Sequence, residues 1–165
     1  MTKGSKSAII NAYYNKRIDM MKIMAVDYGD ARTGLAVCDR TEFLASPVGT
    51  IEERNMQLLA MKVSHMAEQY EVGEIVVGLP LNMNGSFGPR AEKCRQFADM
   101  LNEIAPCPVN MWDERSTTVS AHNILNETNV RGKKRKAVVD TVAATLILEG
   151  YLEYRKNKKT DEQKA

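Results

Sequence analysis

The sequence predicts an α/β fold built on a mixed five-stranded sheet that is flanked by helices. Three short apolar runs, residues 22–26, 33–38 and 47–51, are joined by links too short to contain a helix. Two later runs, 74–77 and 109–112, each follow an amphipathic segment of helical length. Short links join antiparallel strands and helical links join parallel ones, so the sheet should be antiparallel in its first half and parallel in its second.

The composition fits one globular domain in a reducing compartment. The chain has 165 residues, of which 44% are hydrophobic and 27% charged, and its net charge of +2 says little about partners. Three scattered cysteines form no CxxC pair, which argues against a zinc site or a disulfide framework. The apolar stretches are too short to cross a membrane, and the start of the chain has no signal-peptide core. We therefore expect a cytoplasmic protein without a membrane partner.

We expect three segments along the chain: a loose N-terminal extension over residues 1–20, one domain over residues 21–156, and a charged tail over residues 157–165. Within the domain, apolar residues recur at helical spacing over 55–70 and again from Pro89 to the "PCP" sequence that ends the second helix. Further helices are expected over 117–125 and from 137 to about 155, with a basic loop between them. This order of strands and helices is that of a ribonuclease-H-like fold.

Acidic side chains occur in apolar contexts on three separate elements. Asp27 ends the first strand, the pair Asp113 and Glu114 ends the last one, and Asp140 shares a helix face with Ala144. A buried carboxylate without a partner costs several kcal/mol, so three such acids favour a shared cation. Magnesium prefers oxygen ligands, and two such ions can activate water and stabilise the leaving oxygen in phosphodiester cleavage.

Each acid also has an ordinary structural interpretation. Asp27 can form a turn, the "DER" sequence can be a surface ion-pair cluster, and Asp140 can face Lys136 or Arg135. Alternation along a strand directs Asp113 and Glu114 to opposite sides, so only one of them points readily into a given site. The pattern alone leaves open which one it is.

Basic and polar residues near these acids are candidates for nucleic-acid contacts. The sequence "RGKKRK", residues 131–136, has five basic residues in six positions and lies just ahead of Asp140, where it can hold a phosphate backbone. A solvated loop is the alternative interpretation. Asn82 and Asn84 can orient a phosphate or simply form turns, and Gly29 and Gly34 permit a tight turn and a close backbone approach.

Four motifs in order, "DYGDARTGLAVCD", "EIVVGLPLNMNG", "DERSTT" and "VDTVAATLILEGYL", resemble the YqgF/RuvX family. The resemblance runs from about residue 21 to about residue 154. That family is described as pre-16S rRNA nucleases and also as Holliday junction resolvases. The resemblance implies a ribonuclease-H-like fold, metal-dependent hydrolysis of phosphodiester bonds, and a role in maturing the 5′ end of 16S rRNA during ribosome biogenesis.

The resemblance also implies roles for individual residues. Asp27, Glu114 and Asp140 are the expected catalytic residues and ligands of Mg²⁺ or Mn²⁺, with Glu114 favoured over Asp113. RuvC-type resolvases place a glutamate where this chain has Gly78. This departure argues against the hypothesis that the chain is a resolvase. The expected substrate is RNA, the 5′ leader of pre-16S rRNA, or branched DNA, bound by a monomer or a homodimer. The residues expected to contact it are Arg32, Asn82, Arg115, Arg131, Lys133, Lys134, Arg135 and Lys136.

Other functions remain alternatives at this level. A junction resolvase would use the same chemistry as a dimer, because a four-way junction is two-fold symmetric. Sugar kinases and actin-like proteins also use an Asp-x-Gly hairpin, but they need a second lobe for which 165 residues leave no room. A non-catalytic nucleic-acid-binding module would bind RNA without cleaving it.

Overall fold

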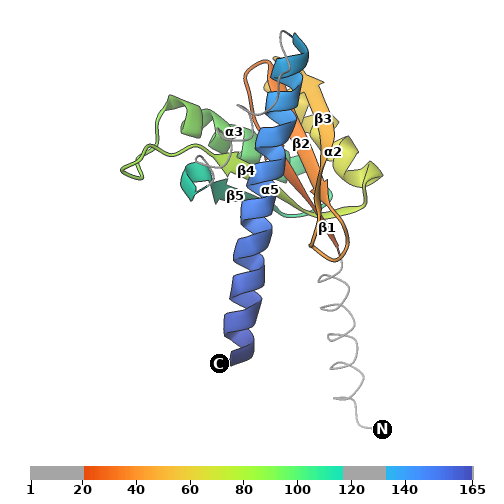
Figure 1. Cartoon of the computed structure of the whole chain (residues 1–165). Helices are drawn as coiled ribbons and strands as arrows, with labels where there is room; N and C mark the ends of the chain where they lie inside the picture. Colours follow the sequence, from red (N-terminus) through yellow and green to blue (C-terminus); the bar gives the residue numbers. More distant parts are fainter. Residues whose placement is uncertain (1–20, 117–132, 165) are drawn as a thin grey trace.

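The computed structural model describes residues 21–116 and 133–164, and it confirms the mixed five-stranded sheet (Figure 1). The strand order is β3-β2-β1-β4-β5, in which β1 pairs antiparallel with β2 and parallel with β4. β3 adds antiparallel to β2, and β5 adds parallel to β4. The strands are β1 (Lys22–Asp27), β2 (Arg32–Cys38), β3 (Ala45–Glu52), β4 (Val72–Leu79) and β5 (Val109–Asp113).

Helices cover both faces of the sheet (Figure 1). The helices α2 (Met56–Gln69) and α3 (Pro89–Ile104) pack on one face, and α5 (Lys133–Lys164) crosses the other. A short 3₁₀ turn, η1 (Glu114–Ser116), follows β5. The side chain of Asn55 caps α2 by accepting a hydrogen bond from the amide of Leu58 at 3.0 Å, which satisfies a donor that the helix cannot.

Two hydrophobic cores form because alternate residues of the central strands point to opposite faces. Met24 and Val26 of β1 pack with α2 and α3, whereas Ile23 and Ala25 pack with α5. The same alternation, carried one residue further, places Asp27 on the face that α5 covers. This face of the sheet is called the α5 face below.

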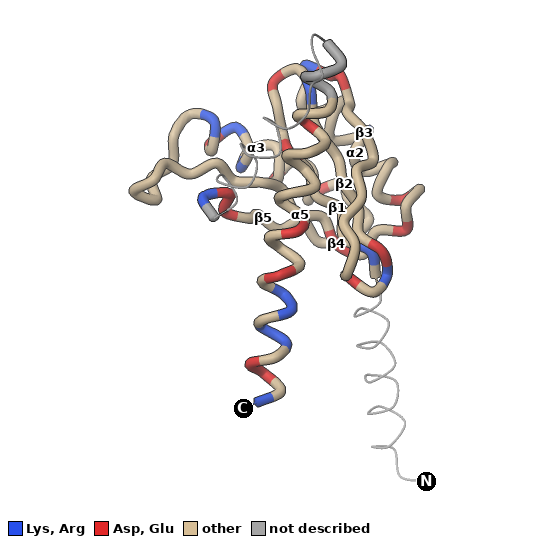
Figure 2. Tube along the Cα trace, viewed as in Figure 1, with Lys and Arg blue, Asp and Glu red and all other residues tan. Residues whose placement is uncertain are grey.

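The last helix is longer at both ends than its apolar pattern predicts. It begins at Lys133, so the segment 133–136, expected as a loop, forms its first turn, and it continues to Lys164 instead of ending near Arg155. The expected charged tail is thus largely helical, with both charge signs along it (Figure 2). Residues 152–164 contain no proline or glycine, and they include Lys, Glu and Gln, which have high intrinsic helix propensity. This segment can therefore be helical even where it does not pack on the core. Residues 1–20 and the helix expected over 117–125 lie outside the described residues.

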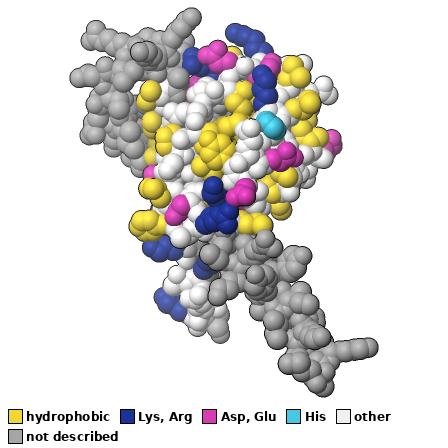
Figure 3. Space-filling view, turned by 90° about the vertical axis from the view of Figure 1, so that its right-hand side faces the viewer, with side chains coloured by type: hydrophobic (Ala, Val, Ile, Leu, Met, Phe, Trp, Pro, Cys, Tyr) yellow, Lys and Arg dark blue, Asp and Glu magenta, His cyan; other side chains and the backbone are white. Residues whose placement is uncertain are grey.

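The side of the molecule that carries α2 has a mixed surface. Acidic, basic and hydrophobic side chains are interspersed on it (Figure 3), and Met61 is 61% exposed. His65 of the same helix is exposed. None of the helices in the described part of the chain is long and apolar enough to span a bilayer.

Candidate metal and nucleic-acid site

Asp27 lies at the carboxyl end of β1, where the strand leaves the core. Its pKa is raised to about 7, first because burial removes water from the carboxylate and second because Glu114 brings a like charge. Arg90 opposes this shift, and Asp140 adds to it. The negative charges of both other predicted ligands therefore raise the pKa of Asp27.

Glu114 and Asp113 follow one another in the chain but lie in different surroundings. Arg115 donates from Nε and Nη2 to Oδ2 of Asp113, at 2.8 and 2.6 Å, and these bonds lower the pKa of Asp113. Glu114 begins η1, and burial raises its pKa. This geometry favours Glu114 over Asp113 as a ligand beside Asp27, and its role as a ligand stays a prediction.

Gly78 of β4 makes the room that Glu114 occupies. A Cβ at residue 78 would lie 3.0 Å from Cδ of Glu114, closer still to its Oε1, and 2.6 Å from Cδ1 of Ile147. Real Cβ atoms do not come this close to other heavy atoms, so a larger residue would displace both side chains. Since Ile147 belongs to α5, the carboxylate of Glu114 lies over Gly78 on the α5 face.

Asp140 reaches the same face because α5 comes very close to β2. A Cβ at Gly34 would lie 2.5 Å from the carbonyl carbon of Asp140 and 3.2 Å from the amide nitrogen of Thr141. Gly34 is the pairing partner of Asp27 in the β1–β2 ladder, so Asp140 is held beside Asp27. Its Oδ2 lies 3.4 Å from Nε of Arg32. The side chains of Arg135 and Lys136, the partners expected for Asp140 in its structural interpretation, lie outside the described part of the chain.

The donor set suits a divalent cation of the magnesium type. Asp27, Glu114 and Asp140 supply carboxylate oxygens from three elements on one face, and burial and mutual repulsion raise the pKa of Asp27. A cation between them would attract all three carboxylates and so lower the pKa of Asp27. Within residues 21–116 and 133–164, no three Asp, Glu, His or Cys side chains are close enough together to hold an ion as they stand. Their side chains would have to draw together to share one.

Three of the residues expected to contact nucleic acid have protein partners in the structure. Arg32 lies between Asp140 and Glu52, at 3.4 Å from each carboxylate. Asn82 donates from Nδ2 to Oγ of Ser86 at 2.9 Å, within a turn of the loop after β4, and its contact with nucleic acid stays a prediction. Arg115 binds Asp113, as described above. Arg32 and Arg115 therefore also order the acids at the site.

The remaining predicted contacts belong to the basic segment 131–136. Arg131 lies outside the described residues, and the backbone of Lys133, Lys134, Arg135 and Lys136 forms the first turn of α5. Asp140 lies further along the same helix, so the helix backbone connects this basic segment directly to one of the three acids. A role in holding nucleic acid stays a prediction for these five residues.

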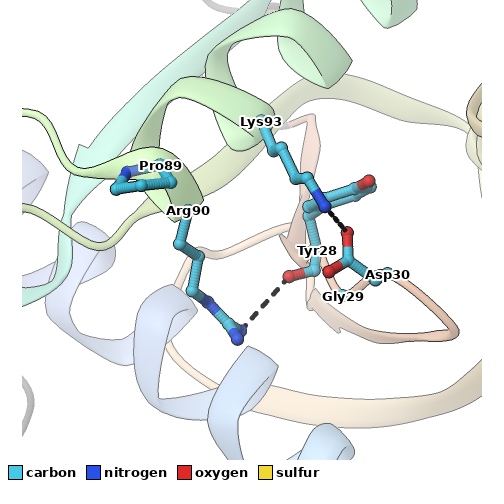
Figure 4. Close-up of a pocket in the computed structure, with 6 residues that line it drawn as sticks. All are labelled: Tyr28, Gly29, Asp30, Pro89, Arg90 and Lys93. Atoms are coloured by element: carbon cyan, nitrogen blue, oxygen red, sulfur yellow. Dashed lines mark hydrogen bonds and ion pairs between the residues drawn. The ribbon is translucent and has the colours of Figure 1, made fainter.

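The sequence analysis missed Arg90 and Lys93, which line a cavity of about 240 Å³ between the turn after β1 and the start of α3 (Figure 4). Nη2 of Arg90 donates to the carbonyl oxygen of Tyr28 at 3.4 Å, and Nζ of Lys93 lies 2.8 Å from Oδ1 of Asp30. The parallel pairing of β1 and β4 brings the loop after β4, and with it the start of α3, to the end of β1. A basic residue directly after Pro89, where the sequence predicts the start of a helix, was the available signal.

Known proteins resemble this chain over most of its length. A family model described as "RuvX: Holliday junction resolvase" matches residues 21–154. The chain belongs to the RuvX family. A protein of Halothermothrix orenii named "Putative pre-16S rRNA nuclease" is 46% identical over 135 residues, covering 82% of this chain and 96% of that protein. One of the same name from Ruminiclostridium cellulolyticum is 39% identical over 134 residues, covering 81% of this chain and 94% of that protein.

Solved structures show that this RuvX-family chain has a ribonuclease-H-like fold, as its element order predicts. Thermus thermophilus RuvC superposes with a TM-score of 0.51 at 11% identity, covering 83% of this chain and 97% of the other. The Fowlpox virus resolvase, solved with Holliday junction DNA, gives a TM-score of 0.52 at 12% identity, covering 81% and 98%. At such low identity these likenesses establish the fold alone.

Proposed function

We propose that this RuvX-family protein is a nuclease that hydrolyses phosphodiester bonds with a bound divalent cation, Mg²⁺ or Mn²⁺. Its proposed substrate is the 5′ leader of pre-16S rRNA, processed in the cytoplasm during ribosome biogenesis. We assign the activity to residues 21–156. One observation carries the proposal: Asp27, Glu114 and Asp140, from three different elements, lie on the α5 face, where the charges of Glu114 and Asp140 both raise the pKa of Asp27.

The chain supplies the ligands and the surroundings of the cation. Asp27 from β1, Glu114 from η1 and Asp140 from α5 would hold it, and they do so best when all three are ionised. When bound, a divalent cation lowers the pKa of its water and stabilises negative charge on the phosphate. Arg32 keeps Asp140 in place through their 3.4 Å ion pair. Because Gly78 has no side chain, it leaves room for the carboxylate of Glu114.

RNA is the proposed substrate because of the relatives. Proteins at 46% and 39% identity, matched over nearly their whole length, carry the name pre-16S rRNA nuclease. A Holliday junction is the second candidate, which the description of the family model favours. Against it, this chain has Gly78 where RuvC-type resolvases carry a glutamate, and here Glu114 fills that space from η1.

Cleavage assays on two substrates test the proposal. The purified chain is incubated with a pre-16S rRNA 5′-leader transcript and, separately, with a four-way DNA junction, each with Mg²⁺, Mn²⁺ or EDTA. We expect cation-dependent cleavage of the RNA, abolished in Asp27→Asn. Symmetric cutting of the junction by a dimer, with intact RNA, would instead establish the resolvase. Binding of RNA without cleavage under any cation would make the protein a non-catalytic module.

A further inference from the structure

Arg90 is an exposed cation near the acidic site, and it has few contacts within the described part of the chain. It lies in the first turn of α3 and lines the cavity between that helix and the turn after β1 (Figure 4). Among the described residues, its guanidinium makes one long hydrogen bond, 3.4 Å from Nη2 to the carbonyl oxygen of Tyr28. Within the described part of the chain, no carboxylate lies at ion-pair distance from it.

Lys93, the other basic residue of the cavity, differs in this respect. Its Nζ is 2.8 Å from Oδ1 of Asp30, so their charges largely cancel. For Arg90 no such ion pair is found among the described residues, although it lines the same cavity. Its charge is therefore not cancelled in the way that the charge of Lys93 is.

The position of Arg90 also works against the helix that carries it. The first turn of a helix carries partial positive charge, so a basic residue there is unfavourable and an acidic one is favourable. Helix stability thus gives no reason for Arg90. Binding of an anion in the cavity does, because a guanidinium presents paired N–H donors that match two oxygens of a phosphate.

We propose that Arg90 is a substrate-binding residue that holds a backbone phosphate of the nucleic acid in this cavity, next to the bond that is cut. This inference rests on the proposed nuclease function. A nucleic-acid strand that reaches Asp27 meets three carboxylates, and Arg90 offsets their repulsion of the strand. RNA and DNA share the phosphate, so this contact does not choose between them.

The test compares Arg90→Gln and Arg90→Lys with Arg95→Gln. Arg95 is a matched control because it lies on the same helix, is exposed and pairs with Glu92 at 2.7 Å, away from the cavity. Binding of a fluorescent single-stranded RNA, measured with Ca²⁺ at several salt concentrations, gives a log–log slope. We expect Arg90→Gln to reduce that slope by about 0.7, the value for one phosphate contact with a single strand. Arg90→Lys should keep the slope but bind more weakly, since it retains the charge and loses the paired donors.

Cleavage by the same variants gives a second measurement. Arg90→Gln should lower kcat/KM about 10–100-fold, with Arg90→Lys between it and the wild type and Arg95→Gln unchanged. A salt slope for Arg90→Gln equal to that of Arg95→Gln would overturn the inference. If the wild type cleaves neither RNA nor DNA, the proposed nuclease function fails, while the slope still decides whether Arg90 contacts phosphate.

Discussion

Replacing Gly78 by alanine should separate activity from stability. The new Cβ would meet two side-chain ends, the carboxylate of Glu114 and Cδ1 of Ile147, the latter at 2.6 Å. Both ends can rotate away, so the sheet itself need not move. The carboxylate of Glu114, however, has to withdraw by about 1 Å from its place beside Asp27.

The expected magnitudes follow from these contacts. Misplacing a catalytic group by about 1 Å can cost on the order of 100-fold in rate, or about 2.7 kcal/mol of transition-state stabilisation. Overpacking by one methyl costs about 1 kcal/mol when only side chains shift, and loss of glycine's freedom in the unfolded chain offsets about 0.4–1 kcal/mol of it. The melting temperature should then change by no more than about 4 °C in a chain of 165 residues.

Metal-dependent cleavage, thermal melting and calorimetric titration with Mn²⁺ on one preparation measure these effects. Gly73→Ala is the matched control, because it lies on the same strand and the three heavy atoms nearest to its Cβ all belong to the side chain of Met21, away from the acids. Gly34→Ala gives the contrast: its Cβ would meet the backbone of α5, 2.5 Å from the carbonyl carbon of Asp140, so we expect several degrees of destabilisation. Wild-type cleavage and Mn²⁺ affinity in Gly78→Ala would refute the reasoning.

Four further predictions concern the charged residues. Asp140→Asn should abolish cleavage while RNA binding, measured by anisotropy, largely survives; full activity would reject Asp140 as a ligand. Glu114→Gln should remove cleavage and Asp113→Asn should keep most of it, because Asp113 is bound to Arg115; equal losses in the two rates would contradict this. The folded-state pKa of Asp27, about 7, exceeds its ordinary 3.8, so the folded chain holds this proton more tightly than the unfolded chain. In EDTA, the unfolding free energy of the wild type minus that of Asp27→Asn should therefore fall from about pH 4 to about pH 7, and a flat difference in denaturant titrations would argue against it. Neutralising the basic segment 131–136 should lower the magnitude of the RNA salt slope by about 0.7 per lost contact, whereas an unchanged slope would make it a solvated surface.

Much of the fold could be predicted because each element has a strong local pattern. The central strands are uniformly apolar, and α2 and α3 have clear apolar stripes, so their existence and order follow from the sequence. The end of α5 could not be predicted in this way. Beyond Leu152 its residues bury little, and the helix is held by its own propensity and by ion pairs such as Arg155 with Glu42 at 2.9 Å.

The candidate site was only partly predictable, for two physical reasons. The choice between Asp113 and Glu114 depends on where β5 ends, because strand alternation stops at the 3₁₀ turn that begins with Glu114. Arg115 then donates a hydrogen bond to Asp113, and the hydrophobic pattern of the sequence cannot predict this contact. Arg90 is far from Asp27 in the chain, and the parallel pairing of β1 with β4 is what brings it near.

The role of Gly78 could not be read from its own strand, and it explains how the acids come together. Asp27 pairs with Gly34 on one side, and on the other the β1–β4 register, which pairs Val26 with Val77, puts Gly78 in the next position. Asp27 is thus flanked, in one row across the α5 face, by two residues without side chains. The backbone of α5 at Asp140 enters the space on one side, and the carboxylate of Glu114 enters the space on the other. A side chain at Gly34 would push back the backbone at Asp140, and one at Gly78 would push back the carboxylate of Glu114. The two glycines of this row are therefore part of what brings Glu114 and Asp140 toward Asp27.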